Sequence, residues 1–113
     1  MIDLETVHEI LCSMPDATEE PHFDKPAYKL KGKIFATFNI ENKWVTIRLT
    51  PEQQAIFCEN EAIYPVPNKW GTHGWTHVDL NRIKKSEFIE VLEVAYQNVK
   101  QSRKSAINKK GET

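Results

Sequence analysis

The sequence predicts a single two-layer α+β domain, in which three helices cover one face of a mainly antiparallel five-stranded sheet. A chain of 113 residues, of which 40% are hydrophobic and 27% charged, is typical of one globular domain with its own core. Apolar and polar residues alternate between residues 27 and 49, whereas both ends of the chain show helical spacing. Strands that follow one another directly favour antiparallel pairing, with the helices segregated to one side.

The first helix is predicted over residues 3–13, because apolar residues recur there at helical spacing and Asp3 can cap its start. Met14-Pro15 ends this helix, and an acidic connector, PDATEEP, follows it. Three strands are then predicted at residues 27–31, 33–40 and 43–49. The turns between them, at Lys31-Gly32 and Glu41-Asn42, are short enough for antiparallel hairpins.

A second helix is predicted to begin at Pro51, because Thr50 and Gln53 match the sequence pattern of a capping box around a proline in the first turn. Proline is favoured at the first helical position, where its missing N–H removes no hydrogen bond. This helix is expected to bury Ala55 and Ile56.

Two short strands are predicted next, at residues 62–66 and 76–80, and Pro65 favours a sheet edge for the first of them. Ser86 can cap a final amphipathic helix. The apolar stripe of that helix contains Phe88, Leu92, Ala95, Tyr96 and Val99. The resulting order is helix, three strands, helix, two strands, helix.

Charge is distributed unevenly along the chain. Residues 1–24 contain seven acidic residues and no Lys or Arg, whereas residues 25–113 contain fifteen basic and nine acidic residues. This asymmetry is compatible with nucleic-acid contact and equally with two solvated surfaces of different charge. The domain is expected to span residues 1–102, followed by a basic, disordered tail at residues 103–113.

The sequence favours a cytoplasmic protein without a membrane segment. Its apolar runs are only a few residues long, and the N-terminal MIDLETVHEI carries acidic residues where a signal peptide would carry lysines. Cys12 and Cys58 lack CxxC spacing, which favours reduced thiols, and a disulfide between them is the less favoured alternative.

The stretch NKWGTHGWTHVDL, residues 68–80, contains His73 and His77 at a spacing that binds zinc on a helix. Glycines flank His73, and THVDL alternates as a strand, in which four residues span about 13 Å, too far for both imidazoles to reach one ion. No metal site or cofactor is therefore predicted. His77 and Asp79 share a strand face, but no nucleophile or oxyanion donor accompanies them, so neither catalytic residues nor enzymatic activity is predicted.

Strand alternation indicates a binding surface on the sheet face opposite the helices. The apolar positions of the strands form the core face, and the intervening side chains point away from it. Aromatic rings interleaved with basic groups can stack on bases and neutralise phosphates, although the tryptophans can instead pack under their own loop or in a dimer contact. The candidate binding residues are Lys29, Lys31, Trp44, Arg48, Trp75 and His77.

Four stretches of the sequence, in this order, resemble the MmcQ/YjbR family. They are HFDKPAYKLKGKIFATF, LTPEQQAIF, AIYPVPNKWGTHGWTHVDL and AYQNV, and the resemblance extends from Leu4 to about Val99. It implies a fold like that of the type III secretion chaperones, in a small cytoplasmic bacterial protein. It also implies DNA binding, and it carries no catalytic residues over to this chain.

The leading functional prediction is weak, largely sequence-independent DNA binding, which depends chiefly on this resemblance and secondarily on the basic surplus after Asp24. The alternative is a protein-binding or dimerising chaperone-like module without enzymatic activity, which the implied fold suggests by analogy.

Overall fold

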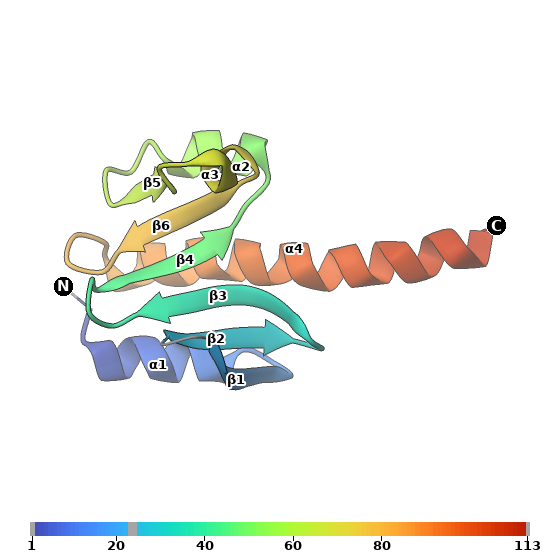
Figure 1. The fold of residues 1–113 in the computed structure, drawn as a ribbon, viewed down its shortest axis with the longest axis horizontal. Helices are drawn as coiled ribbons and strands as arrows, with labels where there is room; N and C mark the ends of the chain where they lie inside the picture. The colour runs from blue at the N-terminus through green and yellow to red at the C-terminus, as the bar shows by residue number, and fades with distance from the viewer. Residues whose placement is uncertain (1, 23–24, 113) are drawn as a thin grey trace.

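The computed structural model describes residues 2–22 and 25–112, with side chains described at 2–20 and 25–101. The described chain forms a six-stranded sheet and four helices, and every strand pair is antiparallel. The strand order is β1-β2-β3-β4-β6-β5 (Figure 1). The elements are α1 (Leu4–Ser13), β1 (Ala17–His22), β2 (Lys25–Leu30), β3 (Lys33–Asn39), β4 (Trp44–Arg48), α2 (Pro51–Phe57), β5 (Ile63–Pro65), α3 (Lys69–Thr72), β6 (Trp75–Asp79) and α4 (Lys85–Glu112).

The core lies between the sheet and the two longest helices, α1 and α4. In Figure 1, α4 passes behind β3 and β4 and continues beyond the sheet. The buried side chains of the central strands alternate along each strand, as expected for a sheet that is covered on one face. The fully buried residues include Val7 and Leu11 of α1, Val45 and Ile47 of β4, Val78 of β6, and Phe88, Val91 and Leu92 of α4. The predicted α+β class and the predicted core face of β4 and β6 are confirmed.

The strand β1 corrects the prediction of five strands, because all of it except His22 was expected to belong to the connector PDATEEP. It pairs with β2 over six residues, from Ala17 opposite Leu30 to His22 opposite Lys25. The strand carries two acidic residues and Pro21, and therefore lacks the alternation that marks a strand in sequence. An edge strand tolerates proline and charged side chains, since one side of its backbone faces no neighbour.

A β-bulge between β2 and β3 interrupts the alternation of buried side chains. The register shifts between Tyr28 and Lys29, which face Ala36 and Ile34 of β3 respectively, so Phe35 has no direct partner. Phe35 and Ala36 are both fully buried as a result. The ring of Phe35 packs edge-on against Tyr96 of α4 at 5.6 Å between centroids, and thus helps to attach the helix to the sheet.

The helix α2 has the predicted capping box, but the two residues that were predicted to be buried are exposed. Thr50 Oγ1 accepts from the Gln53 N–H at 3.1 Å, and the Gln53 side chain accepts from the Thr50 N–H at 3.0 Å. Ala55 and Ile56 face solvent, Ile56 with 66% exposure. The opposite side of α2 is fixed by Gln54, whose amide donates to carbonyl oxygens of Gly71 and Trp75 and to the Thr76 hydroxyl.

The helix α4 begins at Lys85, so Ser86 lies inside it and is not its cap. The N–H of Lys84 donates instead to the Glu87 carboxylate at 3.0 Å, which satisfies a backbone donor at the start of the helix. α4 continues to Glu112. Side chains beyond Gln101 lie outside the described part, and the disorder expected for residues 103–113 stays a prediction. Within the described residues, no helix combines the length and apolarity needed to cross a bilayer.

A single-turn helix, α3, lies between the strands predicted at 62–66 and 76–80, where no helix was predicted. Asn68 caps it by accepting from the Trp70 N–H at 2.8 Å. Two glycines allow this segment to approach the sheet closely. A Cβ on Gly71 would lie 2.0 Å from the Val66 carbonyl oxygen, and one on Gly74 would lie 1.8 Å from the Leu49 carbonyl oxygen.

We expect Gly74→Ala to lower the free energy of unfolding by about 3 kcal/mol or more, because the new Cβ must displace backbone at a positive φ. Gly32→Ala is the matched control. Gly32 also has a positive φ, of +86°, but a Cβ added there would meet no atom within 4 Å. Its cost should be only the strain of the left-handed backbone, about 1–2 kcal/mol. Urea unfolding of both variants measures the difference, and equal losses would contradict the close approach at Gly74.

Candidate functional site

The sheet face opposite the helices, called the open face below, carries the candidate site. Across β4 and β6, Thr46 lies opposite His77, Arg48 opposite Trp75, and Trp44 opposite Asp79. These side chains alternate with the buried residues of the same strands and are half-buried or exposed. Trp44, Trp70 and Trp75 are the chain's three tryptophans.

A groove of about 520 Å³ crosses the open face. We call it the open-face groove. Its lining residues are Lys25, Ile34, Thr37, Thr46, Val66, Trp70, Trp75 and His77. None of these described residues is acidic, and Lys25 supplies a positive charge. The volume falls within the range of about 300–1,000 Å³ that is typical of small-ligand pockets.

His77 of β6 is held on the open face by two aromatic rings and one hydroxyl. Its ring stacks on Trp44 with centroids 4.2 Å apart, and Tyr64 of β5 approaches its edge at 5.5 Å. Its Nδ1 shares a hydrogen bond of 2.8 Å with Thr46 Oγ1. Burial lowers the pKa of His77, and the positive charge of Lys25 lowers it further. The imidazole is therefore neutral at neutral pH and acts as an aromatic surface.

Arg48 and Trp75 form a cation–π pair at the start of β6. The guanidinium carbon of Arg48 lies 6.0 Å from the ring centroid of Trp75, within cation–π range. The Nε of Arg48 donates to the His73 carbonyl oxygen at 3.5 Å. Both side chains also line a neighbouring hollow of about 610 Å³, so Trp75 borders this hollow as well as the groove. An exposed guanidinium thus stands beside an aromatic ring.

The two predicted lysines lie outside the groove. Lys29 is on β2, where its ammonium forms an ion pair with Glu20 of β1 at 3.4 Å. This partner was unforeseen because β1 was not predicted. Lys31 has a φ of 51° and occupies the β2–β3 turn. The structure therefore brings Trp44 together with His77 and Arg48 together with Trp75, but it does not bring either lysine into the lining.

Lys25 and Trp70 line the groove, and neither was among the predicted site residues. Lys25 is the first residue of β2, two residues before Ala27 and four before Lys29, so strand alternation would have placed it on the open face had the strand been predicted from residue 25. Trp70 is 54% exposed and projects from α3. The position of α3 depends on the close approach of Gly71 and Gly74 to neighbouring backbone, which no sequence pattern predicts.

His73 and His77 contact different tryptophans. His73 follows α3 and lies 6.2 Å from the ring of Trp70, whereas His77 stacks on Trp44. Asp79 does not bond to His77 in the structure, since its Oδ1 accepts from the Asn81 N–H at 2.9 Å and His77 pairs with Thr46. This arrangement gives His77 a packing role within the aromatic cluster.

Comparison with known proteins finds one family and one solved structure. A model of the YjbR family matches residues 12–98. The chain also resembles the crystal structure of Deinococcus radiodurans protein DR2400, which contains a DUF419 domain, with a TM-score of 0.73 and 19% identity. That alignment covers 88% of this chain and 79% of the other. No curated protein shows a significant match. At this identity, the structural likeness supports the fold alone.

We expect His77 to titrate below the ordinary histidine pKa of about 6.5. In the unfolded chain, His77 has the ordinary pKa and is protonated at a higher pH than in the folded chain. The stability that neutral His77 contributes is therefore complete above the unfolded-state pKa. It is lost as the pH falls from the unfolded-state pKa to the lower folded-state pKa. NMR titration of the ring signals gives the midpoint, with His77→Gln to assign the resonance. The same variant should show a smaller loss of stability on acidification over that window. A midpoint at or above 6.5 would contradict the half-buried stack.

Proposed function

The chain belongs to the YjbR family, and we propose that it is a non-enzymatic DNA-binding protein. In this proposal it binds DNA weakly, with little sequence preference, in the open-face groove. The observation that supports this proposal most directly is the composition of the groove. Two tryptophans, a neutral histidine and Lys25 line it without an acidic side chain among them. Such a surface can stack on bases and attract phosphates at the same time.

The two kinds of contact would have different parts in binding. Stacking tolerates any base, because every base has a π-face, so the rings of Trp70 and Trp75 would contribute affinity without sequence preference. Lys25 within the groove and Arg48 beside Trp75 would contact the phosphates of such a ligand. Phosphate contacts fix the position of a strand but do not read its sequence.

The aromatic lining favours unpaired over paired bases. Bases within a duplex already stack on one another, and they cannot insert into a groove without being separated, whereas a single strand presents them freely. Weak affinity is expected because the open face also carries acidic groups outside the groove. Glu20 neutralises Lys29, and Asp79 lies opposite Trp44 at the other end of the face.

A protein partner or a second copy of this chain is the alternative, favoured by exposed apolar side chains. Trp70 is 54% and Ile56 66% exposed, and exposed apolar side chains of this size can be buried in a protein contact. The two proposals differ in their dependence on salt. Phosphate contacts weaken steeply as salt rises, whereas burial of apolar side chains does not.

Fluorescence anisotropy with a labelled single-stranded oligonucleotide and its duplex tests the DNA proposal. We expect tighter binding of the single strand and an affinity that falls with salt. Lys25→Gln should weaken binding and reduce the slope of log affinity against log salt by about 0.7. Lys85→Gln removes the same charge from an exposed position at the start of α4 and should change neither.

Trp70→Ala completes this test, because Trp70 is exposed and its truncation should leave the unfolding transition in place. It should reduce the binding free energy by about 1–3 kcal/mol, the worth of one stacked base. Ile89→Ala, at an exposed apolar position on α4, is the control. Absence of binding at low salt, or equal effects of Lys25→Gln and Lys85→Gln, would contradict the proposal. Salt-insensitive dimerisation that Trp70→Ala abolishes would favour the alternative.

A further inference from the structure

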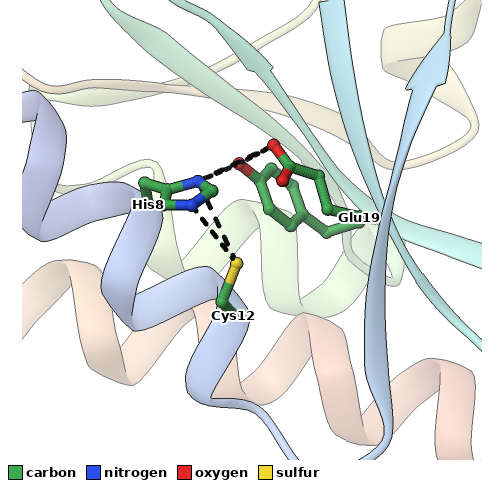
Figure 2. Close-up of polar contacts among 4 residues, drawn as sticks. His8, Cys12 and Glu19 are labelled. Carbon is green, nitrogen blue, oxygen red and sulfur yellow. Dashed lines mark hydrogen bonds and ion pairs between the residues drawn. The ribbon is translucent and has the colours of Figure 1, made fainter.

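A second group of polar side chains lies between α1 and β1, away from the open face (Figure 2). His8 and Cys12 are four residues apart on α1 and therefore share one helix face, and Glu19 extends toward them from β1. One ligand atom from each of the three lies within 4.8 Å of the others. Among the described residues, this is the group of three that could hold a metal ion.

We propose that His8, Cys12 and Glu19 bind a divalent transition-metal ion, and that zinc suits this donor set best. Imidazole nitrogen, thiolate sulfur and carboxylate oxygen are the three donor types that zinc accepts in proteins. Calcium and magnesium require oxygen ligands and would not use the cysteine. The site is independent of the groove, so either proposal can fail without the other.

The donor atoms are near one another, and they must move closer together to bind one ion. His8 Nδ1 lies 3.7 Å from Glu19 Oε2 and 4.0 Å from Cys12 Sγ. Tetrahedral zinc, with bonds of about 2.0–2.3 Å, would set such donor pairs about 3.3–3.7 Å apart. The Cys12 and Glu19 ligand atoms lie within 4.8 Å of each other, so this pair must close by up to about 1 Å. The exposed side chains of Cys12 and Glu19 have the freedom for such a movement.

Tyr28 positions the carboxylate of this group. Its ring is fully buried in β2, and its hydroxyl donates to Glu19 Oε2 at 3.3 Å while lying 3.0 Å from His8 Nδ1. Burial and the nearby Glu19 carboxylate raise the pKa of Tyr28, so the hydroxyl stays protonated and serves as a donor. A rigid residue beneath the ligands is the usual arrangement that orients a metal-binding carboxylate.

The electrostatic surroundings favour a cation over a reactive thiol. Cys12 lies in the last turn of α1, at the negative end of the helix dipole. The Glu19 carboxylate lies within 4.8 Å of its sulfur, so a second negative group is near. These features disfavour a nucleophilic Cys–His–Glu triad, which needs a thiolate. A bound metal ion would release the thiol proton to solvent, form the S–metal bond and neutralise the carboxylate. Three protein donors leave a fourth position for water or a further ligand.

Titration of the reduced, full-length protein with Co²⁺ tests the proposal, because cobalt reports thiolate and tetrahedral ligation in its absorption spectrum. We expect a thiolate-to-cobalt charge-transfer band that saturates at one ion per chain and is lost on addition of zinc. Cys12→Ser should abolish the band. Cys58→Ser should retain it, since Cys58 is the other free cysteine and does not belong to the group. His8→Gln and Glu19→Gln should each weaken binding at least about 10-fold.

Thermal unfolding with and without Zn²⁺ provides a readout that needs no spectrum. A ligand that binds only the folded chain raises its melting temperature. We expect this increase for the wild type and for Cys58→Ser, and not for Cys12→Ser. Absence of a charge-transfer band in the wild type would overturn the site. So would a band that Cys58→Ser reduces as much as Cys12→Ser, or metal binding that His8→Gln and Glu19→Gln leave unchanged.

Discussion

The antiparallel pairing of β4 with β6 joins the two halves of the chain and determines which side chains meet on the open face. The pairing starts at Gly74, whose carbonyl oxygen accepts from the Leu49 N–H at 2.8 Å. Any Cβ at Gly74 would collide with the Leu49 carbonyl oxygen. From this contact the register places Arg48 opposite Trp75 and then Thr46 opposite His77. A shift by one residue would exchange the core and open faces of the strand, so the glycine contact indirectly positions the whole site.

The aromatic residues of the open face divide into two groups. The rings of Trp44, His77 and Tyr64 cover one another and so reduce their own exposure to water. Trp70 and Trp75 lie outside this cluster of three rings and line the groove. The first group packs ring against ring on β4, β5 and β6, and its His77 lines the groove together with the second group. A cluster that orders its rings before binding loses little conformational entropy on binding.

Much of the fold follows from alternation and capping signals, and the misses have identifiable causes. The core faces of β4 and β6 were predictable, because Val45, Ile47 and Val78 alternate with polar or aromatic neighbours. The strand β1 was not, since ATEEPH has no apolar alternation and is a strand only because β2 offers it a free edge. Burial of Phe35 depends on a bulge, which alternation cannot predict. The site shows the same limit, because Lys29 was assigned to it without its partner Glu20.

The indole N–H signals of the three tryptophans report directly on whether the open-face groove binds a single strand of DNA. The measurement is a two-dimensional ¹H–¹⁵N NMR titration of the labelled protein with an unlabelled single-stranded oligonucleotide. We predict that the Trp70 and Trp75 indole signals shift progressively, with smaller shifts at Trp44, which is stacked on His77. The backbone signals of α1 and the described part of α4 should stay in place. Shifts confined to those helices, with all three indole signals unmoved, would contradict binding in the open-face groove.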